Sequence, residues 1–229
     1  MLIIPAINAE TFDEVQKKIK LIEPYSSWAH LDIADGTFTK NTLWHNLLEF
    51  SLLETELNIE LHFMMDRIEE RIDHWLNISV KKIIFHIDGS KDPGFVIERC
   101  HKNKTEVGVA ISPDESITKA MVYKNKVDFF QILGVKPGLP GQKMDENTFD
   151  RIKEVRKFCP SCIIEVDGGM NKETMPKAIE AGANIIVSAS AIFDSGKNIK
   201  EAIEELKNVI RRTNKKIGSD GEHDSPRHY

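Results

Sequence analysis

Two histidines and two aspartates lie within or at the end of short apolar runs. His30 and Asp32 are two positions apart in one run, so in an extended strand both side chains point to the same face. His62 lies near the end of the next run, and Asp167 ends a later run directly before two glycines. Two imidazoles and two carboxylates suit zinc, iron, manganese or cobalt, and ligand type alone does not choose among these metals. The sequence therefore predicts a divalent metal site.

Each of these residues also has a purely structural interpretation. A lone histidine in a strand is more often a satisfied core residue or a surface group than a ligand, which applies to His62 taken alone. Asp32 needs a metal, another cation or a hydrogen-bond cage, because carboxylates are almost never buried without a partner, and a divalent metal would meet this need. His86, which ends a fourth run, is interpreted as a supporting residue because the chain already offers four ligands.

Three turns of small residues follow the later apolar runs and suit a phosphate group. Their backbone amides can approach an anion closely because the side chains are small or absent. Glycine pairs alone are a weak signal, since turns need glycine anyway, but three such turns favour an anion site. Turn by turn, the predicted phosphate-binding residues are Gly138, Gly141 and Gln142, then Gly168 and Gly169, then Ala189 and Ser190.

Eight short apolar runs could supply strands that position these residues. Several runs are almost continuously apolar, which is typical of parallel strands covered on both faces. Segments with helical spacing of apolar residues lie between them, and Thr11 followed by Glu14 predicts a capping box at the start of the first helix. The runs are Leu2–Asn8, Trp28–Ile33, Ile59–Met64, Lys82–Ile87, Glu106–Ile111, Val127–Leu133, Cys162–Val166 and Asn184–Ser188.

This alternation predicts an α/β fold, a single (β/α)8 barrel over residues 1–210. Catalytic side chains of such barrels come from the C-terminal ends of strands, where the polar residues above are found. An open doubly wound sheet is the alternative, but it would more often carry a glycine-rich fingerprint after its first strand, and Asn8 to Phe12 is not one. Residues 211–229 are polar without an apolar period and are predicted to form a flexible C-terminal tail.

Composition excludes several classes of partner. With 31 basic and 36 acidic residues the chain has a net charge of −5, so it offers no broad basic surface for nucleic acid or an anionic membrane. No signal peptide or long apolar span is apparent, which predicts a soluble cytoplasmic protein. Cys159 and Cys162 lack the second ligand pair of a zinc site, so they and Cys100 are expected to be packed thiols without a disulfide.

Five motifs resemble those of the ribulose-phosphate 3-epimerase family, in the same order, over roughly Leu2 to Ile210. Their number and order argue against a chance match. The matching stretches are His30-Leu-Asp32-Ile-Ala-Asp35-Gly36-Thr-Phe38 (H-x-D-x-M-D-G-x-F in the family), Leu61-His62-Phe63-Met64 (H-L-M), Pro137 to Gln142 (P-G-F-x-G-Q), Val166-Asp167-Gly168-Gly169 (V-D-G-G) and Val187 to Phe193 (V-S-G-S-A-I-F).

The resemblance implies a TIM barrel of the ribulose-phosphate-binding type and an isomerase of the pentose phosphate pathway. The implied reaction is metal-dependent epimerisation of D-ribulose 5-phosphate to D-xylulose 5-phosphate at C3, through an ene-diolate. Such a reaction needs two acid/base groups flanking the carbon. Asp32 and Asp167 resemble this pair, and together with His30 and His62 they resemble the metal ligands. The resemblance also implies a homo-oligomer, a small phosphosugar substrate and no organic cofactor.

Several positions depart from the family pattern around the substrate. Ala6 replaces a serine, Ala34 and Leu133 replace methionines, and Ala189 replaces a glycine of the phosphate turn. The ligand set is complete, whereas the substrate contacts are altered, so the exact ketose phosphate stays open. The residues predicted to form the shell of the active site are Ala6, Asn8, Met64 and Leu133.

Two alternatives to this function follow from the departures. A C3 epimerase of a six-carbon ketose phosphate, such as allulose 6-phosphate, would use the same ligands, and the small Ala34 favours it slightly. A diverged phosphosugar-binding barrel without activity is the other, but a pure binder does not need both Asp32 and Asp167. Barrel isomerases of the histidine pathway need an acid at Asn8, and the orotidylate decarboxylase group needs a lysine that is missing between Leu61 and Asp66.

Overall fold

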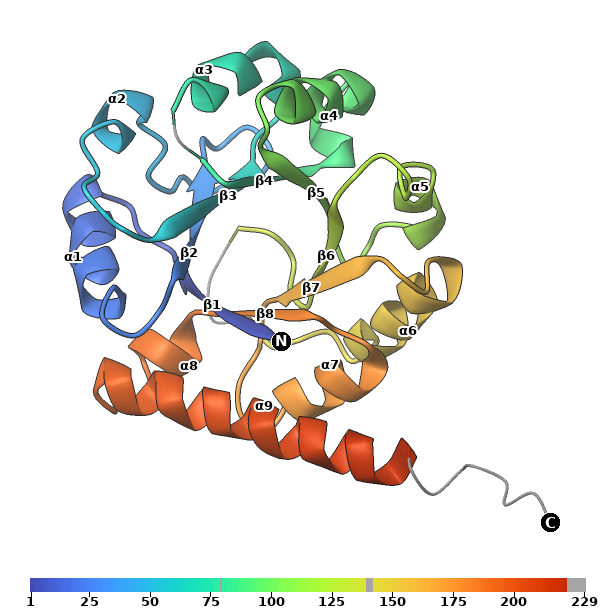
Figure 1. Cartoon of the computed structure of the whole chain (residues 1–229). Helices are drawn as coiled ribbons and strands as arrows, with labels where there is room; N and C mark the ends of the chain where they lie inside the picture. Colours follow the sequence, from blue (N-terminus) through green and yellow to red (C-terminus); the bar gives the residue numbers. More distant parts are fainter. Residues whose placement is uncertain (79, 139–141, 222–229) are drawn as a thin grey trace.

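The computed structural model describes residues 1–78, 80–138 and 142–221. Within these residues, parallel strands pair in the order β1 to β8, and β8 pairs with β1, so that the sheet closes into a barrel. Helices surround the barrel on its outside (Figure 1). The predicted (β/α)8 barrel is therefore confirmed, and the open sheet is excluded.

Each strand begins and ends within two residues of the bounds of a predicted apolar run. The strands are β1 Leu2–Ile7, β2 Trp28–Ala34, β3 Asn58–Met64, β4 Lys82–His86, β5 Glu106–Ile111, β6 Phe129–Leu133, β7 Ile163–Asp167 and β8 Ile185–Ser188. The helices are α1 Phe12–Ile22, α2 Leu47–Phe50, α3 Ile72–Leu76, α4 Pro93–Lys102, α5 Ile117–Met121, α6 Thr148–Phe158, α7 Met175–Ala181, α8 Ser190–Phe193 and α9 Ile199–Gly221, with short 3-10 turns η1 Ile68–Glu70 and η2 Ile87–Gly89.

Alternate residues of β2 and β3 lie in two different environments, because successive side chains of a strand point to opposite faces. One set belongs to the main apolar core between strands and helices, in which Leu31 and Phe63 are fully buried. The other set points into the barrel, where Asp32 forms hydrogen bonds with His30 and His62. The apolar core thus fixes the strands, while the barrel interior is free to carry polar groups.

Strand register brings residues from separate parts of the chain to the same level of the barrel. Asp32 of β2 lies opposite His62 of β3, and Leu133 of β6 lies opposite Asp167 of β7. Because all strands are parallel, their C-terminal ends meet at one mouth of the barrel.

The first helix begins where the sequence predicted. The Thr11 side chain accepts a hydrogen bond from the Glu14 amide at 3.3 Å. The Glu14 carboxylate, however, accepts from the Glu10 amide at 3.0 Å instead of the Thr11 amide. The N-cap is therefore present, with its reciprocal bond shifted by one residue.

The boundary predicted at residue 210 is wrong, because α9 continues to Gly221. Thr213 is 6% exposed and donates its hydroxyl to the Val209 carbonyl at 3.0 Å, so a threonine continues the buried stripe of Leu206 and Ile210. In Figure 1, α9 runs along one side of the barrel, where it packs against α7 and α8. Residues 222–229 of the predicted tail lie outside the described residues.

The expectation of three free thiols is also wrong. Cys159 and Cys162 form a disulfide with their Cα atoms 5.4 Å apart. Helix α6 ends at Phe158, and the following turn, closed by a bond from the Cys162 amide to the Cys159 carbonyl, brings the two side chains together. Cys100 is a free, buried thiol, as expected. Among the described residues, none of the helices combines the length and the apolar character needed to span a bilayer.

Candidate active site

The structure brings His30, Asp32, His62 and Asp167 together at the mouth of the barrel. One ligand atom from each of the four lies within 4.8 Å of the others. Asp32 Oδ1 is 2.9 Å from His62 Nδ1 and 3.3 Å from His30 Nε2. Both histidines and Asp32 are buried, and Asp167 is half-buried. We call these four residues the ligand cluster.

The ligand cluster fits a divalent metal ion. Its four donors are imidazole nitrogens and carboxylate oxygens that lie within 4.8 Å of one another, and three of them belong to buried side chains. The other ring nitrogen of His30, Nδ1, lies 2.7 Å from Glu60 Oε1, which leaves Nε2 for the cluster. Metal-binding histidines usually have such a carboxylate partner, because it fixes the ring orientation and the tautomer. Sequence reasoning missed Glu60, although its position two residues before His62 places it on the same face of β3.

His86 lies directly behind the ligand cluster. Its Nε2 is 3.0 Å from Nε2 of His62, and its Nδ1 is 3.4 Å from the Ser112 hydroxyl. Burial, with a further contribution from His62, lowers the pKa of His86 well below its ordinary value, so the ring is neutral at pH 7. A neutral His86 can support His62 without adding positive charge to the site.

The two carboxyl groups of the cluster differ in acidity. Burial opposes ionisation of Asp32, but hydrogen bonds from His30 and His62 hold its pKa below the ordinary value. Burial raises the pKa of Asp167 to about 6. Burial also disfavours a charged His30, yet hydrogen bonds to Asp32 and Glu60 raise its pKa well above the ordinary value. Two carboxyl groups with separated pKa values are suited to opposite roles in proton transfer.

A second buried polar group lies one layer deeper in the barrel. Gln131 donates to Glu165 at 3.0 Å, and the Lys82 ammonium is 4.0 Å from Glu60 Oε2. Burial, with a further contribution from the nearby Glu60, raises the pKa of Glu165 well above its ordinary value. No sequence motif marks this layer, since each of its residues stands alone within its strand.

A cavity of about 410 Å³ opens above the ligand cluster. It is lined by predicted residues of every group: Asp32, His62 and Asp167 of the cluster, Ala6, Asn8, Met64 and Leu133 of the shell, and Gly138, Gln142, Gly168, Gly169, Ala189 and Ser190 of the turns. The predicted Gly141 lies outside the described residues. Sequence reasoning missed the lining residues Lys18 and Asp194, which belong to no motif.

The double-glycine turn after β7 needs glycine at both positions. Gly168 and Gly169 have φ angles of 92° and 72°, in the left-handed region. A Cβ atom would approach Val135 to 2.8 Å at the first position and Met144 to 2.7 Å at the second. The turn is held by the Thr174 hydroxyl, which donates to the Gly169 carbonyl at 2.8 Å. Because neither residue has a side chain, the backbone of this turn is exposed to the cavity.

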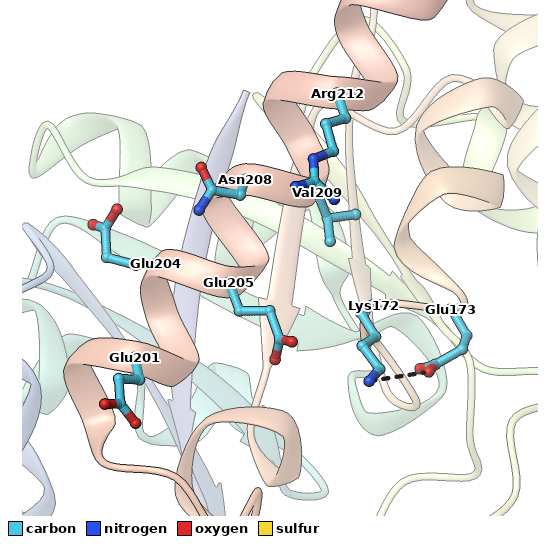
Figure 2. A pocket seen from close by; sticks show the side chains of 8 residues that line it. All are labelled: Lys172, Glu173, Glu201, Glu204, Glu205, Asn208, Val209 and Arg212. Atoms are coloured by element: carbon cyan, nitrogen blue, oxygen red, sulfur yellow. Dashed lines mark ion pairs between the residues drawn. The ribbon is translucent and has the colours of Figure 1, made fainter.

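A larger groove of about 690 Å³ lies on the outer surface, between α9 and the loop before α7 (Figure 2). Its side chains are mostly charged, with a 3.8 Å ion pair between Lys172 and Glu173. It shares no lining residue with the barrel-mouth cavity. Since its charged groups are largely exposed to water, the groove lacks the buried, converging groups that typify an active site.

Comparison with known proteins agrees with this geometry. Residues 2–193 match the family model described as "Ribulose-phosphate 3 epimerase family". The chain is 26% identical to ribulose-phosphate 3-epimerase of Schizosaccharomyces pombe, over 92% of this chain and 94% of that protein. It is 32% identical to the enzyme of the same name from Chlamydia pneumoniae, over 77% of this chain and 80% of that protein.

Solved structures of lower identity support the fold. The 3-hexulose-6-phosphate synthase of Salmonella typhimurium superposes with a TM-score of 0.70 at 9% identity, covering 93% of this chain and all 100% of that one. Phosphoribosyl anthranilate isomerase of Thermococcus kodakaraensis gives a TM-score of 0.62 at 17% identity, covering 92% and 98%. From the barrel, the ligand cluster and the match over most of its length, this chain belongs to the ribulose-phosphate 3-epimerase family of isomerases.

Proposed function

We propose that the protein epimerises D-ribulose 5-phosphate and D-xylulose 5-phosphate at C3. The observation that carries the proposal is the pair Asp32 and Asp167, which reach the same cavity from β2 and β7 beside two histidines. The family match and the names of its relatives support the same reaction.

The two carboxylates provide the proton chemistry. The C3 proton is acidic because the carbon adjoins the C2 ketone, and its removal leaves an ene-diolate. One carboxylate accepts this proton, and the carboxylic acid on the other side returns a proton to the opposite face of the carbon. The separated pKa values of Asp32 and Asp167 allow one group to be ionised while the other is protonated.

The ligand cluster would hold one zinc, iron, manganese or cobalt ion. The bound ion supplies a Lewis acid that offsets negative charge on the substrate oxygens. Glu60 orients the His30 ring for this role through its 2.7 Å contact with Nδ1. We propose no organic cofactor.

The turns after β6, β7 and β8 would bind the phosphate group. Binding at this remote group orients the reacting carbon between the carboxylates and raises the rate without taking part in the chemistry. The described residues proposed for this role are Gly138, Gln142, Gly168, Gly169, Ala189 and Ser190, and Gly141 was predicted with them.

The six-carbon alternative loses the observation that favoured it. Ala34 is fully buried and packs with Leu43, Met64 and Phe38, and it does not line the described cavity. Because Ala34 does not line the cavity, its small size gives no support to a larger substrate.

The first experiment follows the C3 proton by NMR in deuterated water. Metal-loaded protein is incubated with D-ribulose 5-phosphate, with a chelator-treated sample as control and D-allulose 6-phosphate in parallel. We expect chelator-sensitive loss of the C3 proton signal together with formation of D-xylulose 5-phosphate. Metal-loaded protein that exchanges no proton of the pentose phosphate would contradict the proposal.

Asp167→Asn is expected to lower the turnover rate by at least about 1,000-fold, because the amide cannot accept or return the proton. Asp194→Asn is the matched control, since Asp194 lines the same cavity outside the ligand cluster and should keep turnover within about 3-fold. Steady-state kinetics, with circular dichroism to verify folding, would measure both. Unchanged turnover in Asp167→Asn would defeat the assignment.

Assembly and location stay predictions. We propose a homo-oligomer, and the molar mass from light scattering would test it. The cytoplasmic location was predicted because no signal peptide or long apolar span is apparent. The bond between Cys159 and Cys162 counts against this location, because disulfides are uncommon in reducing compartments.

A further inference from the structure

Helix α1 places an ammonium group at the cavity that no sequence motif indicated. Lys18 is half-buried and lines the cavity with Ala189 and Ser190. Its Nζ donates to the Asn8 carbonyl at 2.5 Å and lies 5.4 Å from the centre of the Phe193 ring. The side chain therefore reaches over the end of β1 to α8.

Lys18 has no acidic partner among the described residues. Lys18 is in none of the ion pairs found within 4.0 Å among the described residues, and the Asn8 carbonyl satisfies only one of its three ammonium hydrogens. The other lysine of the cavity, Lys136, is 66% exposed and pairs with Asp114 at 2.6 Å. Lys18 is thus the less hydrated and less neutralised of the two cations, and a half-buried charge in this state favours an anionic ligand.

Lys18 lines the same part of the cavity as the turn after β8. Strand β1 pairs with β8, so that Pro5 lies opposite Ser188. Ala189 and Ser190 follow directly, and Phe193 lies about one helical turn beyond Ser190. Figure 1 shows α1 and α8 on the same side of the barrel, beside β1 and β8.

The lysines that line the cavity can supply positive charge to an anionic ligand. The lining carboxylates are Asp32, Asp167 and Asp194, against the two ammonium groups of Lys18 and Lys136. A phosphate dianion binds more strongly where a full positive charge lies close to it, and a metal ion in the ligand cluster would offset the charge of Asp32 and Asp167. Backbone amides of the turns carry only partial charges, whereas Lys18 carries a full one.

We propose that Lys18 is a substrate-binding residue whose ammonium pairs with the phosphate of the sugar at the turn formed by Ala189 and Ser190. This inference rests on the proposed function, because it takes the ligand to be a phosphosugar. The contact is an ion pair with hydrogen bonding, in which no covalent bond forms or breaks. It acts on binding and leaves the proton transfer to Asp32 and Asp167.

The first test titrates inorganic phosphate into the metal-loaded full chain by calorimetry. Lys18→Met keeps the length of the side chain and removes its charge, and Lys18→Arg keeps the charge. Lys17→Met is the matched control, since Lys17 is exposed on the same helix and does not line the cavity. We expect the dissociation constant to rise about 10- to 100-fold in Lys18→Met and to stay within about 3-fold in the other two. Phosphate binding in Lys18→Met equal to that of the wild type would overturn the proposal.

The second test separates phosphate binding from a structural or catalytic role. With D-ribulose 5-phosphate, Lys18→Met should raise KM about 10- to 100-fold with kcat within about 3-fold. With unphosphorylated D-ribulose, its kcat/KM should equal that of the wild type. Equal losses on both sugars would refute phosphate recognition. If the wild type epimerises neither sugar, the proposed function fails, and the phosphate titration still decides the role of Lys18.

Discussion

At the scale of single residues, the ligand cluster is organised around one oxygen atom. Asp32 Oδ1 accepts hydrogen bonds from ring nitrogens of both His30 and His62, so a proton lies between each nitrogen and the carboxylate oxygen. A metal ion takes the place of such protons, because its ligands must be deprotonated. The same buried geometry would therefore hold protons at low pH and a metal ion at higher pH.

Metal affinity is expected to rise with pH through about 6. In the metal-free protein the pKa of Asp167 is raised to about 6 and that of His30 is raised as well, so both groups hold protons in weakly acidic solution. The folded chain thus binds the Asp167 proton more tightly than the unfolded chain, and this carboxyl group loses its stabilising effect as the pH rises through 6. A divalent metal must displace the same protons, so its affinity should fall about tenfold per pH unit below 6 for each proton displaced.

Calorimetric titration with Zn²⁺ or Mn²⁺ between pH 5 and 8, in buffers of different ionisation enthalpy, would report both affinity and proton release. His86→Gln serves as a comparison, because His86 lies outside the four ligands. A pH-independent affinity without proton release would argue that the ligand cluster does not hold the metal.

At the scale of elements, helix α1 both packs on the barrel and supplies a residue of the cavity. Its apolar side, with Val15, Ile19 and Ile22 buried, packs against the barrel. The same helix carries Lys18 to the cavity, so the packing of α1 fixes where that ammonium lies. The amphipathic spacing predicted this helix, but a lysine on its polar side gave no sign of facing a ligand.

Thr11→Ala is expected to lower the free energy of unfolding by about 1 kcal/mol, because the Glu14 amide loses its acceptor at the helix start. Thr11→Ser keeps a hydroxyl acceptor and should lie within about 0.5 kcal/mol of the wild type. Urea denaturation followed by circular dichroism measures the difference. Equal stability of the alanine and serine variants would show that the cap contributes nothing.

At the scale of the whole molecule, α9 completes the outer helical layer beside β1 and β8 (Figure 1). Its length decides where the folded chain ends. Lys216 is 3.3 Å from Glu180 of α7, an exposed ion pair that adds little by itself. The buried Thr213 gives the stronger reason to count this segment as part of the barrel.

A chain ended after residue 210 is expected to unfold at a temperature roughly 4 to 8 °C lower, which corresponds to about 2 kcal/mol for a domain of this size. The loss arises because the contacts of Thr213 and the last turns of α9 are removed. A chain ended after Gly221 keeps α9 whole and is the control, measured in the same calorimetric scan. Equal midpoints for the two shortened chains would restore the boundary at residue 210.

Much of this protein was determined by local sequence. Apolar runs of strand length separated by amphipathic helices predicted the barrel, since a parallel strand must be apolar toward the helices that cover it. The ligand cluster was predicted from residue types at strand ends, because parallel strands bring their ends to one mouth. The Gly168-Gly169 turn followed from conformations that only glycine adopts easily.

Other features were decided only by tertiary structure. Glu60 and Lys18 have local surroundings like those of many residues, and the contacts that place them at the site are distant in sequence. Glu60 meets His30 across 30 positions, and Lys18 meets Phe193 of another helix. Strand register made Glu60 the partner of His30, and the packing of α1 against the barrel brought Lys18 to the cavity. Residue type and spacing specify which groups are available, whereas long-range packing decides which of them meet, because contact energies between distant segments do not appear in any local pattern.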